Sequence, residues 1–325
     1  MATRLLITGG AGFIGSNLVE HFLNDSRVAL VRVIDDLSNG YMENVESFLS
    51  HPRFEFVRGD ICDYDTCRQV MRGVTHVSHQ AALGSVPRSL ENPMRTNEVN
   101  VGGTVNILHA AKEAGVERVV LAFSSSTYGD SRELPKVEER IGRPLSPYAV
   151  SKYAAELYAE VFARTYGLPF IGLRYFNIFG PRQNPNNPYA AVIPIFCKSF
   201  LEGLPPKING DGNTTRDFTY VENALIANEL ALFTKNREAL NQVYNVACGE
   251  QISLNQMVDM LRRISDKDLQ PVYGPERPGD VRHSHADISK IRRYLGYEPR
   301  VYMQEGLQRV YQYYAKTLTM ASMPA

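Results

Sequence analysis

The stretch Thr8-Gly9-Gly10-Ala11-Gly12-Phe13-Ile14-Gly15 decides the fold class of this chain of 325 residues. It follows an apolar run at residues 5–8 and precedes an amphipathic run at residues 16–23, so it predicts a strand, a tight turn and a helix. The glycines allow the turn, the approach of a ligand to the backbone and close packing of helix on strand. Because free N–H groups at a helix start bind anions, we expect a dinucleotide pyrophosphate here. The expected contacts are Gly9, Gly12, Phe13, Ile14 and Gly15.

Apolar runs and amphipathic stretches alternate through the rest of the first half. Further strands are predicted at residues 28–34, 54–57, 76–79, 119–123 and 170–173. Helices are predicted at residues 65–71, 100–114 and 147–166. This alternation is typical of an α/β fold, a Rossmann-type doubly wound parallel sheet with helices on both faces.

The second half of the chain reads as a smaller and less regular lobe. A segment rich in Pro and Asn at residues 181–188 predicts a loop, and helices are expected at residues 192–201, 223–233, 254–264, 286–295 and 303–316. A chain of this length suits two lobes. We expect a dinucleotide-binding domain at residues 1–174 and about 221–250, and a smaller mixed α/β lobe at residues 175–220 and 251–325.

Composition excludes several classes of function. Lys plus Arg number 35 and Asp plus Glu number 35, which argues against a dedicated nucleic-acid or membrane-surface binder. No apolar run reaches the roughly 18 residues of a membrane span. The four cysteines lack the spacing and the His partners of a metal site, so we expect reduced thiols and no metal. Because no leader pattern is visible either, we expect a cytoplasmic protein.

Acidic residues follow the second and third expected strands. Asp35 lies about 20 residues after the last glycine, where a carboxylate accepts hydrogen bonds from the adenosine ribose. A carboxylate there repels a 2′-phosphate, so NAD is favoured over NADP as the cofactor. Asp60 is placed to meet the adenine. The contacts expected from this region are Asp35, Asp36, Ser38, Asn39, Gly40, Asp60 and Ile61.

A tyrosine and a lysine share one face of the helix expected at residues 147–166. Tyr148 and Lys152 are four residues apart, and Ser124 follows the strand expected at residues 119–123. A phenol has an unperturbed pKa of about 10, but a nearby ammonium and a positive nicotinamide ring favour the phenolate. We therefore predict that Tyr148 removes a proton from a substrate hydroxyl and that Ser124 hydrogen-bonds the same oxygen. Lys152 is also expected to hold the nicotinamide ribose.

These residues resemble the extended short-chain dehydrogenase/reductase family across nearly the whole chain. The resemblance is carried by residues 8–15, Asp60-Ile61, His79-Gln80-Ala81-Ala82, the cluster at residues 124–129, Tyr148 with Lys152, and residues 173–177. Residues 81–89 and 279–284 carry a finer resemblance to bacterial UDP-N-acetylglucosamine 4-epimerases of surface-polysaccharide pathways. The family resemblance implies an NAD-dependent UDP-sugar 4-epimerase, with the smaller lobe binding the UDP-sugar.

The resemblance also implies a mechanism and a set of contacts. Tyr148 deprotonates the sugar O4 while the C4 hydride passes to tightly bound NAD, the 4-keto sugar turns over, and hydride returns to the other face. UDP-N-acetylglucosamine and UDP-N-acetylgalactosamine are the expected substrates, with UDP-glucose and UDP-galactose as further ones. Implied cofactor contacts are Gln80, Ala81, Ala82, Asn100, Tyr148, Lys152 and Tyr175. Implied substrate contacts are Gly84, Ser85, Ser124, Ser125, Ser126, Tyr148, Asn177, Ala191, Val192, Lys207, Asn209, Arg216, Arg277, Asp280 and Ser284.

Two positions narrow the reaction and the substrate. Dehydratases of the family carry Asp-Glu where this chain has Ser125 and Ser126, which argues against dehydration. Epimerases restricted to plain hexoses carry a bulky aromatic residue where this chain has Ser284, so the resemblance implies room for an N-acetyl group.

Three alternative functions compete with this interpretation. The nearest is a 4-epimerase of UDP-N-acetylhexosaminuronates, in which Arg88 or His283 could meet the C6 carboxylate. A uronate decarboxylase would need an acid in the loop after Ser124, and none is there. A regulator that binds NAD without turnover would typically lack Tyr148 or Lys152, and both are present.

The helix that carries Tyr148 is apolar over much of its surface. Its apolar residues include Ala149, Val150, Tyr153, Ala154, Leu157, Val161 and Phe162. One lobe is not expected to bury all of them, and the resemblance implies pairing through this helix and the one at residues 100–114. We therefore expect a homodimer.

Overall fold

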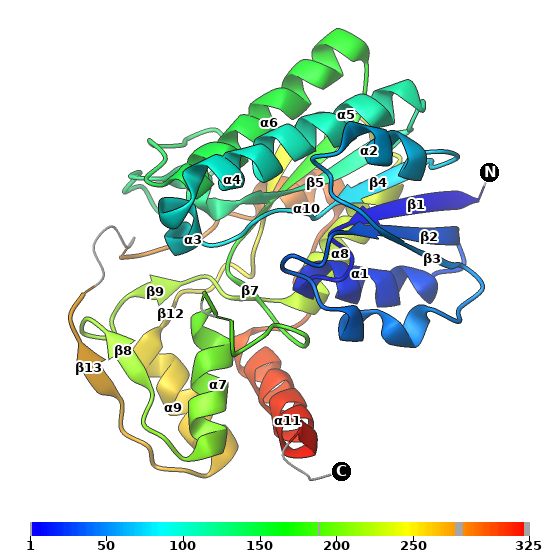
Figure 1. Ribbon diagram of the computed structural model, residues 1–325. Helices are drawn as coiled ribbons and strands as arrows, with labels where there is room; N and C mark the ends of the chain where they lie inside the picture. The colour runs from blue at the N-terminus through cyan, green and yellow to red at the C-terminus, as the bar shows by residue number, and fades with distance from the viewer. Residues whose placement is uncertain (1, 188, 277–281, 322–325) are drawn as a thin grey trace.

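The computed structural model describes residues 2–187, 189–276 and 282–321, and a parallel sheet of seven strands organises its larger lobe (Figure 1). The strand order is β11-β6-β5-β4-β1-β2-β3. The strands are β1 (Thr3–Thr8), β2 (Val28–Asp35), β3 (Phe54–Arg58), β4 (His76–His79), β5 (Arg118–Ser124), β6 (Phe170–Tyr175) and β11 (Gln242–Val246). The strand order reverses between β1 and β4, as in a doubly wound sheet. The predicted Rossmann-type fold class is confirmed.

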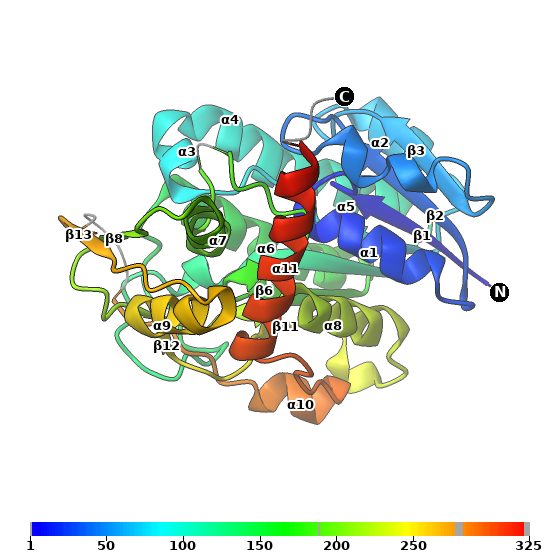
Figure 2. The same ribbon diagram turned by 90° about the horizontal axis from the view of Figure 1, so that it is seen from below.

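Helices cover both faces of this sheet, as Figures 1 and 2 show. The helices α1 (Phe13–Leu23), α8 (Val221–Phe233) and α10 (Ser289–Leu295) share a buried core with Leu5 and Ile7 of β1. The helices α2 (Tyr64–Val70), α5 (Thr104–Glu113) and α6 (Pro147–Tyr166) share the opposite core with Leu6. Successive side chains of a strand point to opposite faces, so a sheet covered on both sides requires the unbroken apolar runs seen in the sequence.

The smaller lobe lies below the sheet in Figure 1 and packs three helices around a core of its own. These helices are α7 (Val192–Glu202), α9 (Leu254–Ser265) and α11 (Met303–Ala321). Three pairs of short strands complete it: β7 (Ile178–Phe179) with β10 (Thr219–Tyr220), β8 (Lys207–Asn209) with β13 (Val272–Gly274), and β9 (Thr215–Arg216) with β12 (Ile252–Ser253).

Several elements differ from the sequence expectation. The helix expected at residues 100–114 begins as a π-helix, η3 (Glu98–Gly103), and continues as α5. Six short helices were not predicted, because each is too short to show a helical period. They are η1 (Met42–Asn44), η2 (Glu46–Phe48), α3 (Val86–Glu91), α4 (Pro93–Asn97), η4 (Ser125–Tyr128) and η5 (Arg237–Ala239).

Two segments from the second half of the chain pack with the sheet. As expected for residues 221–250, α8 and β11 belong to the larger lobe. The helix α10 falls within residues 251–325, which we assigned to the smaller lobe, yet it packs against α8 and β11. The domain boundaries themselves stay a prediction.

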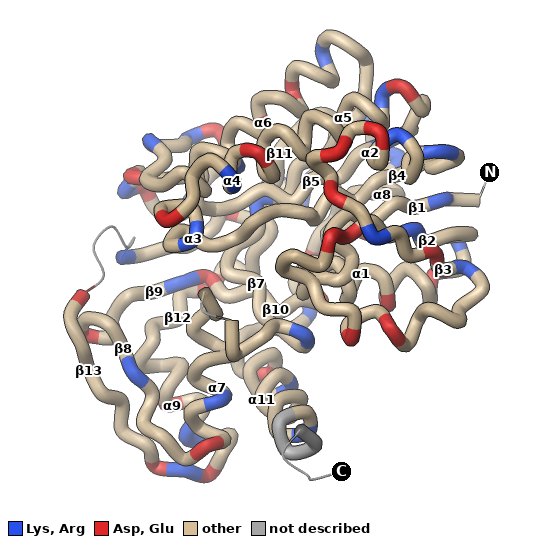
Figure 3. The backbone as a smooth tube through the Cα atoms, viewed as in Figure 1, with Lys and Arg blue, Asp and Glu red and all other residues tan. Residues whose placement is uncertain are grey.

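Charged residues are spread over both lobes. Figure 3 shows Lys and Arg interspersed with Asp and Glu along the chain, which agrees with the equal totals of 35 each. Among the described residues, no group of three His, Cys, Asp or Glu side chains could hold a metal ion. Crossing a membrane would need a longer or more apolar helix than any in the described ranges.

Candidate active site

A cavity of about 720 Å³ lies at the carboxyl ends of the parallel strands. It is lined by the segments that follow β1 to β6, and by residues of the smaller lobe such as Arg216 and Ser284. Open parallel sheets bind their ligands at this edge, next to the point where the strand order reverses. The residues predicted at the ends of different strands therefore meet around one cavity.

The glycine turn has the shape that a bound pyrophosphate needs. Gly9 has a φ of 68°, and a Cβ atom on Gly15 would lie 2.1 Å from the carbonyl oxygen of Gly9. A side chain at either position would therefore distort the turn. No side chain caps the start of α1, which begins after Gly12, so its first N–H groups face the cavity end of the helix. The turn fits a dinucleotide because it offers backbone donors and a helix dipole to its phosphates.

Asp35 is tied by hydrogen bonds to the backbone of the glycine turn and of the residues that follow β2. Its two carboxylate oxygens accept hydrogen bonds from the N–H groups of Ala11 and Leu37, each at 2.9 Å. Burial raises the pKa of Asp35, and these backbone donors oppose that rise. The next acid, Asp36, accepts from both N and Oγ of Ser38 at 2.9 and 2.7 Å. Both acids line the cavity. A carboxylate in this place can accept hydrogen bonds from ribose hydroxyls, whereas it would repel a phosphate group.

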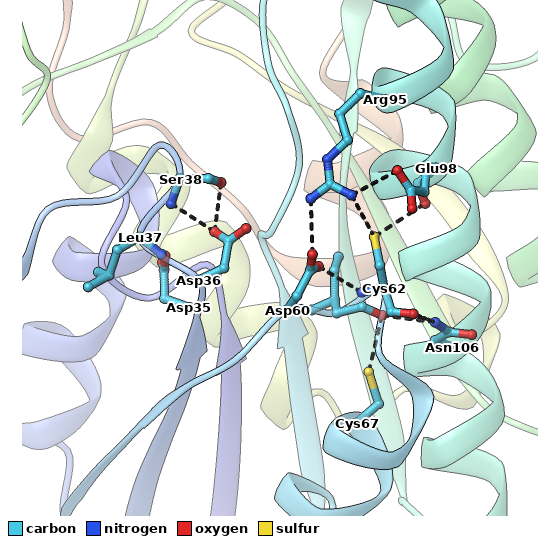
Figure 4. Close-up of polar contacts among 11 residues, drawn as sticks. Asp35, Asp36, Leu37, Ser38, Asp60, Cys62, Cys67, Arg95, Glu98 and Asn106 are labelled. Atoms are coloured by element: carbon cyan, nitrogen blue, oxygen red, sulfur yellow. Dashed lines mark hydrogen bonds and ion pairs between the residues drawn. The ribbon is translucent and has the colours of Figure 1, made fainter.

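Asp60 is held in place at the end of β3, as Figure 4 shows. Its carboxylate accepts from the N–H of Cys62 at 2.8 Å and pairs with Arg95 at 2.9 Å. Arg95 also pairs with Glu98 at 2.8 Å, so the guanidinium bridges two acids. Burial alone would raise the pKa of Asp60, but the Cys62 N–H and the Arg95 charge outweigh it and lower the pKa. Asp60 is therefore a fixed anionic acceptor at the cavity rim.

Figure 4 also shows the two cysteines near this rim. The Cys67 thiol donates to the carbonyl oxygen of Ile61 at 3.3 Å, and the Cys62 thiol donates to that of Glu98 at 3.7 Å. Both are free thiols, as are Cys197 and Cys248. Burial raises the pKa of the Cys62 and Cys67 thiols to about 12, so neither is a thiolate at neutral pH.

The predicted catalytic residues come from two neighbouring elements. Ser146 caps α6 by accepting from the N–H of Ala149 at 3.1 Å, which places Tyr148 in the first turn of the helix. Ser124 ends β5, and its side chain interacts with the phenol of Tyr148 and opposes the rise in the pKa of that phenol. Because Ser126 Oγ already donates to Ser124 Oγ at 2.9 Å, the Ser124 proton is free to point at the phenol oxygen. Ser124 and Tyr148 can therefore meet the same substrate oxygen.

Lys152 lies one turn after Tyr148 and is buried. Its ammonium donates to the carbonyl oxygen of Ala122 at 2.9 Å. Burial lowers the pKa of Lys152 to about 8, and the charge of Glu156 opposes that fall. Burial also raises the pKa of Tyr148, and the hydrogen bond from Ser124 opposes the rise. We expected Lys152 to lower the pKa of Tyr148, but within the chain alone desolvation of the phenol prevails.

A buried ion pair holds α6, the helix that carries Tyr148 and Lys152, against β6. Arg174 of β6 donates from Nε and Nη2 to the two carboxylate oxygens of Glu156, at 3.0 and 2.6 Å. Glu156 also accepts from Thr127 at 3.2 Å, and Arg174 donates to the Tyr128 hydroxyl at 3.2 Å. The pair therefore ties α6 to β6 and to η4, the turn that follows Ser124.

Asn100 lies behind the cavity wall and not in it. Its side chain accepts from the N–H of Leu83 at 2.7 Å and donates to Leu83 O and Ser151 Oγ at 3.1 and 3.0 Å. Ser151 in turn donates to the carbonyl oxygen of Tyr148 at 2.8 Å. We expected Asn100 to contact the cofactor directly, but the structure gives it these protein partners and places it outside the cavity-lining set.

Most of the other predicted site residues line the cavity. Those that do so include Gly9, Gly12, Phe13, Ile14, Gly15, Ser38, Asn39, Gly40, Ile61, Gln80, Ala81, Ala82, Gly84, Ser85, Ser125, Ser126, Tyr175, Asn177 and Ala191. Three further predicted residues, Val192, Lys207 and Asn209, are not among the residues that line it. Arg277 and Asp280 lie outside the described residues.

The sequence prediction missed part of the cavity wall. Arg182, Gln183, Asn184 and Asn187 line the cavity from the segment that we read only as a loop, and Tyr189 lines it directly after that segment. The buried side-chain oxygen of Gln183 has no hydrogen-bond partner among the described residues. The run of Asn and Gln between prolines was the available signal, since such side chains suit polar ligands.

Comparisons with known proteins agree with this site. The model of the NAD dependent epimerase/dehydratase family matches residues 5–247. A putative UDP-glucose 4-epimerase of Methanocaldococcus jannaschii is 37% identical over 308 residues, which cover 94% of this chain and 96% of that protein.

Solved structures match over nearly the whole chain. A UDP-N-acetylglucosamine 4-epimerase of Methanobrevibacter ruminantium, in complex with UDP-N-acetylmuramic acid, has a TM-score of 0.91 at 36% identity and covers 97% of this chain and 98% of its own. A UDP-glucuronic acid 4-epimerase of Bacillus cereus, in complex with UDP-glucuronic acid and NAD, has a TM-score of 0.90 at 32% identity and covers 97% and 100%. The chain therefore belongs to the NAD dependent epimerase/dehydratase family, within the extended short-chain dehydrogenase/reductases, and is an NAD-dependent enzyme.

Proposed function

We propose that this enzyme interconverts UDP-N-acetylglucosamine and UDP-N-acetylgalactosamine by inverting C4, and that it also accepts UDP-glucose and UDP-galactose. The single observation that carries the proposal is that Ser124 and Tyr148 line the same cavity as the glycine turn. The printed names of similar proteins, which include 4-epimerases of UDP-glucose and UDP-N-acetylglucosamine, support it.

The chain's own residues account for the proton chemistry. Tyr148 takes the proton from the sugar O4 and returns it after the sugar has turned, while Ser124 donates to the same oxygen. Bound NAD supplies a reversible hydride acceptor and a positive charge that favours the phenolate. Lys152 lines the cavity and is fixed against Ala122, and it would hold the ribose of the cofactor. The turn at Gly9 to Gly15 retains the cofactor between half-reactions.

The wall of the cavity favours an N-acetylated sugar. Ser284 lines the cavity, and its small side chain leaves space that a bulky aromatic residue would fill. Ser125 and Ser126 also line it, so the two positions at which a dehydratase needs acids hold hydroxyls.

A 4-epimerase of UDP-N-acetylhexosaminuronates is the second candidate. Of the two side chains that could meet a C6 carboxylate, Arg88 lines the cavity, whereas His283 is not among the lining residues and bonds Thr215 at 2.9 Å. Arg88 is already engaged, because it donates to Asn39 at 3.0 Å and lies 4.8 Å over the ring of Tyr189. This engagement favours the neutral sugar as the main substrate.

The enzyme is proposed to act as a homodimer. Val150, Leu157, Tyr158 and Val161 recur on one side of α6 and are between 41 and 53% exposed in the single chain. A second copy packed on this face would cover them, as pairing through α5 and α6 would do.

The proposal is tested by incubating the purified protein separately with UDP-N-acetylglucosamine, UDP-glucose and the UDP-N-acetylglucosamine uronate, without added NAD, and identifying products by NMR. We expect the 4-epimer of UDP-N-acetylglucosamine to form fastest. Turnover of the uronate alone would select the second candidate. If no substrate is epimerised and Tyr148→Phe behaves as wild type, the proposal fails.

A further inference from the structure

Lys136 is a buried lysine in the cavity wall that the mechanism above does not use. It lies in the loop between β5 and α6, is only 3% exposed, and lines the same cavity as Tyr148 and Ser284. Its backbone is fixed, because its N–H donates to His285 O at 2.7 Å and its carbonyl oxygen accepts from the N–H of Asp287 at 2.9 Å. Lys136 therefore stands beside the segment that carries Ser284.

The ammonium of Lys136 has capacity for a further acceptor. It donates to the carbonyl oxygen of Ser131 at 2.5 Å, the one hydrogen-bond acceptor that the described residues give it. A lysine ammonium carries three donors, and leaving them unsatisfied in a buried place is costly. Burial lowers the pKa of Lys136, with the charge of Glu133 opposing. An oxygen atom of a ligand in the cavity would relieve this deficit.

We propose that Lys136 is a substrate-binding residue that donates to a carbonyl or carboxylate oxygen carried on the edge of the hexose ring, with the acetamido carbonyl at C2 as its main acceptor. The inference rests on the proposed function. It names a hydrogen-bond donor for the N-acetyl group, for which the small side chain of Ser284 leaves space. Both residues then contribute to binding the N-acetyl group, because Ser284 leaves space for it and Lys136 donates a charge-assisted hydrogen bond to it.

The proposed turnover of the sugar explains why one donor can serve two substituents. Inverting C4 requires the ring to present its other face while C4 returns to Tyr148. A half-turn about the axis from C1 to C4 does this, and it exchanges the edge that carries C2 with the edge that carries C6. A donor fixed in the wall then meets the C2 substituent in one orientation and the C6 substituent in the other. Plain hexoses offer only hydroxyl groups at both places.

The test compares Lys136→Met with wild type on UDP-N-acetylglucosamine, UDP-glucose and the UDP-N-acetylglucosamine uronate. Loss of a hydrogen bond from a charged donor should raise KM for UDP-N-acetylglucosamine about tenfold, and KM for UDP-glucose by less than about threefold. Lys267→Met is the matched control, because Lys267 also donates to backbone carbonyl groups, those of Phe200 and Leu201 at 2.6 and 3.0 Å, but does not line the cavity. Its KM values should not change.

Each outcome decides the inference. A larger KM shift for the uronate than for the neutral sugar would assign the carboxylate as the main acceptor and support the donor role. Equal shifts for all three substrates, or none, would overturn it, because a lysine that only braces the loop at Ser131 affects every substrate alike. If Lys136→Met does not fold, Lys136→Gln is scored in the same way. If the wild type turns over none of the substrates, the proposed function fails. The dissociation constants of the three UDP-sugars, measured by calorimetry for wild type and Lys136→Met, are then compared in place of the KM values.

Discussion

The ammonium of Lys152 donates to the carbonyl oxygen of Ala122 at 2.9 Å, so the lysine one turn after Tyr148 is tied to the last part of β5. The side chain that acts on the pKa of the Tyr148 phenol is that of Ser124, two residues further along the same strand. Strand β5 thus contacts both members of the tyrosine–lysine pair, whose spacing is set by helix α6.

Tyr148→Phe should abolish most of the activity without loss of bound NAD or of nucleotide binding. The variant keeps the ring and loses the group that exchanges a proton with O4, so kcat should fall about 10³-fold. NAD content and nucleotide binding should stay at the wild-type level. Tyr153→Phe, on the same helix, is the control and should retain full activity. Epimerase assays with both variants decide this, and a Tyr148→Phe enzyme with more than a tenth of wild-type kcat would contradict the assigned role.

Glu156→Gln should shift the pH profile. The pKa of Lys152 is about 8 in the fold, so a step that needs the ammonium loses rate as pH rises through 8. Glu156 raises that pKa, and removing its charge should move this falling limb to lower pH. Glu160→Gln, exposed on the same helix, should leave the limb in place. If the rate of Glu156→Gln falls at the same pH as that of wild type, the Glu156 carboxylate does not act on the pKa of Lys152.

The same substitution should lower stability. Arg174 is 5% exposed at its side chain and would lose its charged partner, which costs about 3–5 kcal/mol for a buried pair. Denaturant unfolding at constant pH measures this. An unfolding free energy within about 1 kcal/mol of wild type would mean that Arg174 finds another partner.

Gly15→Ala should expel the cofactor. The new Cβ would meet the carbonyl oxygen of Gly9 at 2.1 Å, so the turn must open or α1 must shift. The purified variant should carry little NAD, measured after acid release, and should melt at a lower temperature. Gly102→Ala is the matched control, since a Cβ there meets no atom within 4 Å. Full NAD content in Gly15→Ala would refute the role given to the turn.

Leu157→Arg should separate the proposed dimer. Leu157 is 45% exposed in the single chain, and a charge in its place would be buried without a partner in the pair. Sedimentation at micromolar concentration should give a dimer for wild type and for Glu160→Arg, and a monomer for Leu157→Arg. A wild-type monomer would overturn the proposal outright.

The glycine turn, the strand ends and the tyrosine–lysine spacing were predictable because each has a local pattern. The apolar runs of β1 to β6 and the 20 residues of α6 follow directly from periodicity and from the caps at Ser146 and Gly167. Asp35 and Asp60 lie at the cavity for the same reason, since strand ends share one edge of a parallel sheet.

What escaped prediction depends on long-range contacts. Lys136 has no local signal, and its place in the wall comes from pairing with the chain at residues 285–287, about 150 residues away. The segment at residues 181–188 reads only as a loop, and the bonds of Asn100 to Leu83 join residues 17 positions apart. The pKa of Tyr148 rises for a similar reason, because burial is a property of the assembled fold.

In the proposed mechanism, C4 is oxidised and reduced again within one active site. Wild-type enzyme without added NAD is therefore incubated in ordinary water with UDP-N-acetylglucosamine carrying deuterium at C4, and the products are read by NMR. We predict UDP-N-acetylgalactosamine that retains deuterium at C4. Product with protium at C4 would mean that the hydrogen exchanges with solvent and would contradict the account, as would the absence of any 4-epimer.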